Sequence, residues 1–186
     1  MDLERVCLDS IKKQFMHYKK LGEQAMAQVE EERLFHAPNE DTNSIAVVVK
    51  HLRGNMLSRW TDFRTTDGEK SWRDRDGEFV NDIAGRDELL ALWNEGWDCL
   101  FAAIDSIGPG ELTDVIHIRN EAHTIMDALN RQLAHYPYHV GQIVYAAKQL
   151  KDGAWSSLSI PRNRSAEYSG IRFGQSPGLA ADEPGR

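Results

Sequence analysis

The chain has 186 residues, with 29 acidic and 22 basic side chains, a formal net charge of −7 and 41% hydrophobic residues. This length is typical of one compact domain, and the ordinary hydrophobic content excludes a wholly disordered or low-complexity protein. The net negative charge argues against a nucleic-acid partner, because proteins that bind by neutralising phosphates need a basic face.

Apolar residues recur every three or four positions in residues 3–29, which predicts a first amphipathic helix. Residues 39–44 contain turn formers and several residues that can cap a helix, and they lead into a second predicted helix over residues 44–63. Residues 64–85 are too polar and too aperiodic for a core segment, so we expect a long, charged loop on the surface.

Helical spacing returns in residues 86–107, and Gly108 and Pro109 then provide a stop signal. Residues 114–119 alternate weakly and predict either a short strand or an extended lead-in to a fourth helix over residues 121–150. Four such segments predict an all-α fold, a four-helix bundle with the long charged loop between its second and third helices. We expect this bundle domain to occupy residues 1–165 and a mobile tail to follow over residues 166–186.

No segment predicts a membrane partner or export. The longest strongly apolar run, Ile45 to Val49, is far shorter than the roughly 20 residues that span a bilayer. The first residues are acidic and lack the apolar stretch of a secretory signal. Cys7 and Cys99 lie alone in periodic apolar patterns and are predicted to be buried free thiols, which fits a cytoplasmic protein.

Two histidines, His135 and His139, lie four residues apart in the fourth predicted helix. This spacing places both imidazoles on one helix face, where they can share an ion. His51 lies beside the apolar stripe of the second predicted helix, and three neutral imidazoles would leave open positions on a divalent cation. A chance pair or an ordinary polar contact explains the same spacing. The other four histidines are predicted to face solvent: His17, His36, His117 and His123.

Two residues between His135 and His139 affect how the pair is interpreted. Tyr136 stands where metalloproteases of the H-E-x-x-H type have their general base, which disfavours peptide hydrolysis. Pro137 removes a backbone donor, so it either breaks the helix and makes the pairing accidental, or introduces a tolerated kink that aims the two rings. Spacing alone does not decide between these alternatives.

Three blocks of sequence resemble, in this order, the uncharacterised bacterial branch of the DinB/YfiT-like superfamily: KHLRGNMLSRWTDF at residues 50–63, TTDGEK at residues 65–70 and NRQLAHYPYHVGQI at residues 130–143. The similarity covers residues 44–165. It implies an up-down-down-up four-helix bundle, commonly a homodimer, in which His51, His135 and His139 hold one divalent metal ion. It also implies that Pro137 is tolerated. Relatives include transferases and isomerases that use a low-molecular-weight thiol, and others have no known activity.

These features lead to a first hypothesis of a divalent-metal-dependent enzyme, a thiol-dependent S-transferase that acts on small electrophiles. Its cofactors would be one ion of the Zn, Ni or Fe type and a low-molecular-weight thiol, because a divalent cation lowers the pKa of a coordinated thiol. The alternatives are a metal-dependent small-molecule hydrolase and a non-enzymatic, metal-binding, stress-associated protein. The expected partners are a second copy of the chain and a small thiol or electrophile.

Four polar residues lie near the histidines in the predicted helices and are candidates for supporting the ligands or binding the substrate: Asn55, Arg59, Arg131 and Gln142. An ordinary surface or helix-packing role fits each of them equally well. The second predicted helix is locally basic and would suit a small anionic substrate.

Overall fold

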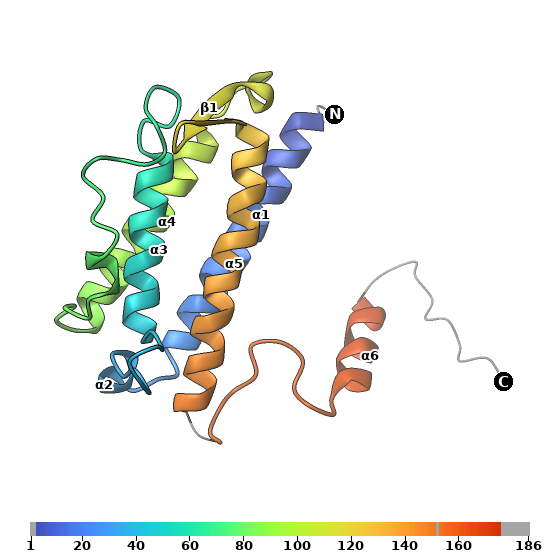
Figure 1. Cartoon of the computed structure of the whole chain (residues 1–186). Helices are drawn as coiled ribbons and strands as arrows, with labels where there is room; N and C mark the ends of the chain where they lie inside the picture. Colours follow the sequence, from blue (N-terminus) through green and yellow to red (C-terminus); the bar gives the residue numbers. More distant parts are fainter. Residues whose placement is uncertain (1–2, 152, 176–186) are drawn as a thin grey trace. The chain divides into compact units, whose positions relative to one another are not determined.

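The computed structural model describes residues 3–151 and 153–175 and is mostly helical (Figure 1). The chain divides into two compact units, Met1–Asp152 and Gly153–Arg186. In the described part, no helix combines the length and the apolar character needed to cross a membrane.

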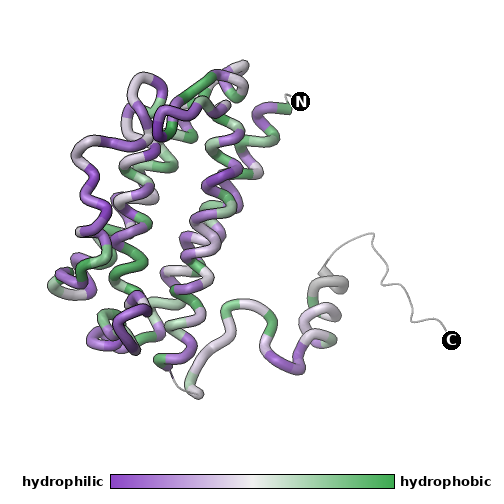
Figure 2. Tube along the Cα trace, viewed as in Figure 1, coloured by the Kyte–Doolittle hydropathy of each residue, from purple (hydrophilic) through white to green (hydrophobic). Residues whose placement is uncertain are grey.

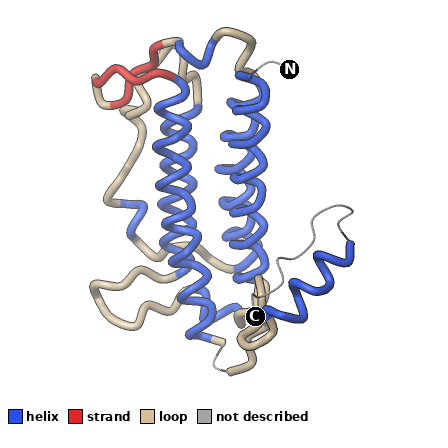
Figure 3. Tube along the Cα trace, turned by 90° about the vertical axis from the view of Figure 1, so that its right-hand side faces the viewer, coloured by secondary structure: helices blue, strands red, loops and turns tan. Residues whose placement is uncertain are grey.

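Four long helices lie side by side in the first unit (Figures 1 and 3): α1 (Leu3–Met26), α3 (Ile45–Trp60), α4 (Arg86–Asp105) and α5 (Ile125–Leu150). Hydrophobic and hydrophilic positions alternate along them, as amphipathic helices require (Figure 2). α3 packs most extensively on α4 and α1 on α5, and α3 also contacts α5. The short helix α2 (Glu31–Leu34) lies between α1 and α3 in the sequence.

Aromatic side chains from three helices meet in the core. Phe15 of α1, Trp97 of α4 and Tyr136 of α5 are fully buried, and their ring centroids are 5.7–6.3 Å apart. Such tilted and edge-on ring pairs add to the free energy that burial alone provides. Tyr136 directly follows His135 in α5, so this aromatic cluster adjoins the predicted histidine pair.

Two capping residues fix where the site-bearing helices begin. The Ser44 hydroxyl accepts a hydrogen bond from the Val47 backbone at the start of α3. Thr124 and Asp127 form a reciprocal capping box at the start of α5. Both devices satisfy backbone N–H groups that the first helical turn leaves free.

The prediction that the fourth helix begins at residue 121 is wrong, and the fold is not purely helical. β1 (Val115–Ile118) pairs antiparallel with β2 (Glu121–Thr124), so α5 begins only at Ile125. Arg119 and Asn120 form the connecting turn with φ values of 55° and 62°. A two-residue hairpin turn of this kind normally contains glycine, and its absence hides the hairpin from sequence reasoning.

Residues 64–85 contain the 3-10 helix η1 (Gly77–Phe79), and a second one, η2 (Glu111–Thr113), precedes β1. Most of this segment lies on the surface as predicted, but not all of it, because Glu78 is only 5% exposed and the Arg73 side chain only 1%. These two side chains form a two-point ion pair, with Arg73 Nε 2.7 Å from Glu78 Oε1 and Nη2 2.9 Å from Oε2. Burial of charged residues is tolerated here because each is paired.

The second unit contains helix α6 (Ser165–Gln175), which the weak periodicity of this region did not predict. Residues 165–171 of this helix are exposed. The boundary at residue 165 between a bundle domain and a mobile tail stays a prediction. Residues 176–186, for which mobility is predicted, lie outside the described part of the chain.

Candidate metal centre

The three predicted ligands come together where α3 faces α5. His51, His135 and His139 each offer a ring nitrogen, and the three nitrogens lie within 4.8 Å of one another. The Nε2 atoms of His135 and His139 are 3.0 Å apart. The His51 ring centroid lies 4.7 Å from that of His139 and 5.6 Å from that of His135.

Pro137 does not break the helix that carries the pair. α5 is continuous from Ile125 to Leu150, so the alternative of a helix break with an accidental pairing is wrong. Because the helix continues, His135 and His139 occupy neighbouring turns of one face.

Each of the three rings is held by a hydrogen bond at Nδ1. His51 Nδ1 lies 2.9 Å from Glu78 Oε2, His135 Nδ1 lies 3.2 Å from Gln132 Oε1, and His139 Nδ1 lies 3.1 Å from Gln142 Oε1. All three partners are acceptors, so the network assigns the proton of each ring to Nδ1. The Nε2 lone pairs are therefore free, as a metal ligand requires.

The donor set fits a first-row divalent cation. Two unprotonated Nε2 atoms at 3.0 Å direct lone pairs at each other, an arrangement that a cation between them relieves. Zinc–nitrogen bonds of about 2.0–2.1 Å in a tetrahedral site place two nitrogens about 3.3 Å apart, close to the distance found here. Three imidazoles leave at least one coordination position for an exogenous ligand.

Burial keeps two of the imidazoles neutral. Burial and, to a smaller extent, the neighbouring His139 and His51 together lower the pKa of His135 to about 3. Burial also lowers the pKa of His139, although the hydrogen bond to Gln142 partly opposes this effect. Both rings are thus in the metal-binding protonation state near neutral pH.

Glu78 supplies the only charged partner among the three Nδ1 acceptors. Its burial alone would raise the pKa of the carboxyl group, but the hydrogen bonds from His51 and Arg73 outweigh that effect and lower it. The negative carboxylate makes the His51 imidazole a stronger donor to a metal. A Cβ atom at Gly54 would lie 2.6 Å from Glu78 Cδ, so glycine at this position of α3 makes room for the contact.

Sequence reasoning missed Glu78, Arg73 and Gln132. Gln132 precedes His135 by three residues and Gln142 follows His139 by three, so a search for acceptors at helical spacing would have found Gln132 together with the predicted Gln142. Glu78 carries no such signal, because it is 27 positions from His51 in an aperiodic segment.

The remaining candidates make no described hydrogen bond to the three histidines. Asn55 is buried and accepts a hydrogen bond from the Tyr136 hydroxyl at 3.3 Å. Arg59 is buried and donates to the Gly68 carbonyl and to Glu69, so it anchors the 64–85 segment. Arg131 is exposed.

The other histidines and the cysteines follow the predictions in part. His17, His36 and His117 are exposed as predicted, whereas His123 is half-buried. Cys7 and Cys99 are free thiols, but both are half-buried rather than buried. Burial raises the pKa of the Cys99 thiol, which disfavours the reactive thiolate at neutral pH.

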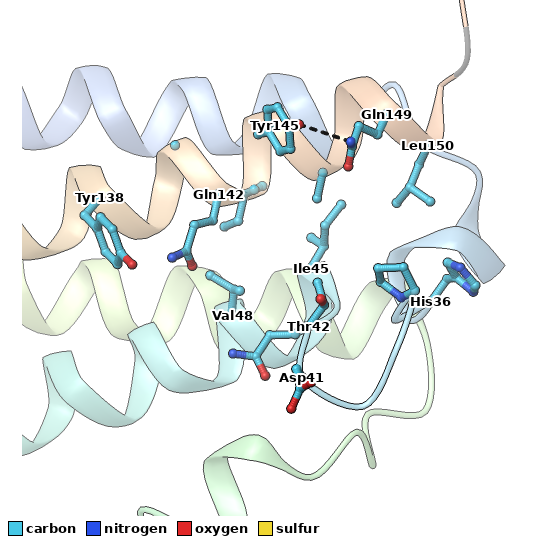
Figure 4. Close-up of a pocket in the computed structure, with 15 residues that line it drawn as sticks. His36, Asp41, Thr42, Ile45, Val48, Tyr138, Gln142, Tyr145, Gln149 and Leu150 are labelled. Carbon is cyan, nitrogen blue, oxygen red and sulfur yellow. Dashed lines mark hydrogen bonds between the residues drawn. The ribbon is translucent and has the colours of Figure 1, made fainter.

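Two exposed aromatic side chains flank the histidines, and one of them, Tyr138, also lines a neighbouring cavity. Phe79 stacks on His51 with a centroid distance of 5.4 Å, and the Tyr138 ring lies 5.0 Å from that of His139. A cavity of about 650 Å³ runs between α3, α5 and the segment before α3 (Figure 4). Gln142, which holds His139, is one of its lining residues.

Comparison with known families gave one match. The model of a family described as "Protein of unknown function (DUF1572)" matches residues 2–164. The searches of curated proteins and of solved structures found no match.

Proposed function

The chain belongs to the DUF1572 family of proteins of unknown function, and from the chemistry of its histidine cluster we propose that it is a divalent-metal-dependent enzyme that transfers a small thiol to small electrophiles. The observation that carries this proposal is the orientation of the three histidines. Each Nδ1 is hydrogen-bonded to an acceptor, which leaves three Nε2 lone pairs for one ion. A divalent cation bound there would lower the pKa of a coordinated thiol and so provide a nucleophile at neutral pH.

The proposed reaction is a substitution at carbon. A sulfur–carbon bond forms between the thiol and the electrophile, and the bond between that carbon and its leaving group breaks. The leaving group departs with the bonding electron pair, and the thiol proton passes to solvent. His51, His135 and His139 hold the cation, while Glu78, Gln132 and Gln142 fix the ring orientations.

The state of the nearby carboxylate favours a thiol over water as the nucleophile. Glu78 is engaged by both His51 and Arg73, so it is not free to act as a general base on a water molecule. Tyr136 cannot replace it, because its side chain is fully buried and its hydroxyl is bonded to Trp60 and Asn55. A coordinated thiol, with an ordinary pKa of about 8.5, needs only a small lowering to become a thiolate at neutral pH, whereas water starts from about 15.7.

The proposal includes the assembly and the fold type that the DinB/YfiT-like resemblance implies. In it, α1, α3, α4 and α5 constitute an up-down-down-up four-helix bundle, and the protein acts as a cytoplasmic homodimer. The continuous α5 with its two histidines and the pairing of α1 with α5 and of α3 with α4 support this bundle.

A direct test uses protein purified without an affinity tag or chelator and loaded in turn with Zn²⁺, Ni²⁺ and Fe²⁺. Turnover of monochlorobimane with cysteine as the thiol is expected to require the metal. His139→Ala should lower it at least 100-fold, whereas the exposed control His17→Ala should leave it unchanged. Turnover that is independent of the thiol would favour the hydrolase, and metal binding without turnover would favour the non-enzymatic alternative. Failure to bind any metal would exclude all three.

A further inference from the structure

The cavity beside the metal centre begins within one turn of the ligands on both helices. On α5 it is lined by Tyr138 and Gln142, which flank His139, and on α3 by Val48, which precedes His51 by three residues. Figure 4 shows Tyr138 and Gln142 at one end, with His36 and Leu150 at the other. From Gln142 to Gln149 the helix rises about 10 Å, at 1.5 Å per residue.

The lining of the cavity is mostly apolar and carries little charge. Ile45, Val48, Ile143 and Leu150 contribute aliphatic side chains, and Tyr145, whose hydroxyl accepts a hydrogen bond from Gln149, adds an aromatic ring. No lysine or arginine is among the residues that line it in the described part of the chain, and Asp41 is the one acidic residue among them. A volume of about 650 Å³ is in the range of sites for small organic molecules.

The basic residues of α3 do not line this cavity and are already paired. Lys50 pairs with Asp82 and Arg53 with Glu95, and both basic residues line a second cavity together with Glu78, while Arg59 pairs with Glu69. These pairs remove the argument for an anionic substrate that the local basic charge of α3 suggested.

We propose that the cavity lined by Val48, Gln142 and Tyr145 binds the apolar part of the substrate and that the substrate is therefore a neutral electrophile with an aromatic or alkyl tail of up to about 10 Å. This inference rests on the proposed function. The reactive carbon lies at the Tyr138 end, beside His139, and the tail extends along α5 towards Leu150. Gln142 belongs to both parts of the site, because it lines the cavity and holds the His139 ring.

The first test measures binding of the neutral fluorescent probe N-phenyl-1-naphthylamine to metal-free protein. Ala146→Trp, which fills the cavity from α5, should raise the dissociation constant of the probe at least tenfold. Ala102→Trp is the matched control, because Ala102 is an exposed helical alanine of α4 outside the cavity, and it should bind the probe like the wild type. Both variants should keep the wild-type metal affinity within a factor of two.

A second variant that reduces the cavity volume keeps the test valid if Ala146→Trp fails to fold. A Cβ atom at Gly141 meets no other atom within 4 Å, so Gly141→Leu can fold while its side chain narrows the cavity. It should also weaken probe binding. Wild-type probe affinity in both Ala146→Trp and Gly141→Leu would overturn the assignment of the cavity.

The closing experiment separates this inference from the proposed function. The metal-loaded protein is assayed with cysteine and 1-iodoalkanes of increasing length, in which the carbon–iodine bond breaks and iodide leaves. kcat/KM is expected to rise about fourfold per methylene until the chain reaches about 10 Å and then level off, with no rise in Ala146→Trp. Turnover that is flat with chain length in the wild type would overturn the cavity as a substrate site and leave the thiol transfer standing. No turnover with any chain length, together with tight probe binding, would instead overturn the proposed function.

Discussion

At the scale of single residues, Glu78 is the charged hydrogen-bond partner of His51. Glu78→Gln keeps an acceptor oxygen near His51 Nδ1 but removes the negative charge. Since such partners raise the basicity of a ligating imidazole, metal affinity measured by competition with a chelator should fall about 10- to 100-fold. Asp82→Asn removes a charge from the same segment at an exposed position and should change the affinity less than twofold. Equal affinities in Glu78→Gln and the wild type would show that the carboxylate does not support the metal.

Alanine substitutions at two helical glycines, Gly54 and Gly141, should change the free energy of unfolding in opposite directions. Gly54→Ala places a methyl group 2.6 Å from Glu78 Cδ, so it should lower the free energy of unfolding by about 1–3 kcal/mol. Gly141→Ala meets no atom within 4 Å and should raise that free energy by about 0.5–1 kcal/mol, because alanine is the better helix former. Urea denaturation measures both changes, and a neutral Gly54→Ala would mean that the Glu78 side chain readily moves aside.

The candidate site was partly predictable at the residue scale because its ligands follow helix periodicity. His135, His139 and Gln142 share one face of α5, and that spacing can be read directly from the sequence. Glu78 could not be found in this way, since its contact with His51 depends on how a long irregular segment folds back onto α3. The role predicted for Arg59 at the site stays a prediction, and its hydrogen bonds to Gly68 and Glu69 depend on the same segment.

At the scale of elements, Asp67 connects the 64–85 segment to the β1–β2 hairpin. Its carboxylate accepts hydrogen bonds from the backbone N–H groups of Arg119 at 2.8 Å and Asn120 at 2.7 Å. Burial alone would raise the pKa of Asp67, but these backbone hydrogen bonds and one from Glu69 outweigh it and lower the pKa. A carboxyl group with a lowered pKa stabilises the fold above its ordinary pKa, and this contribution disappears as the pH falls through the folded-state value.

Asp67→Asn should therefore lower the free energy of unfolding by about 2 kcal/mol at pH 7. The difference from the wild type should begin to shrink as the pH falls below about 4, where the carboxyl group of the unfolded chain takes up a proton, and it should vanish below the lowered folded-state pKa. Chemical denaturation across this pH range measures the effect. Asp76→Asn, at an exposed position in the same segment, is the control and should show little change. A difference between Asp67→Asn and the wild type that is constant with pH would contradict the role of the charge.

The long helices were predictable to within a few residues at this scale, and the short-strand alternative for residues 114–119 is confirmed by β1, but the other short elements were not predicted. α3 and α4 follow strong apolar periodicity, and Ser44 marks the start of α3 as an N-cap. β2 was read as the first turn of α5, because four residues are too few for either period to be distinguished. The turn at Arg119 and Asn120 owes its positive φ values to tertiary contacts with Asp67, which no local pattern reveals.

At the scale of the whole molecule, the three histidines connect helices from two packing pairs. α3 packs chiefly on α4 and α5 chiefly on α1, while the histidines join α3 to α5. An ion bound only by the folded chain at 100 times its dissociation constant should stabilise the fold by about 2.7 kcal/mol, which raises Tm by about 5–10 °C. Differential scanning calorimetry with and without Zn²⁺ measures this rise. It should vanish in His51→Ala, which removes the only ligand from α3, and persist in His17→Ala. An undiminished rise in His51→Ala would place the stabilising ion elsewhere in the protein.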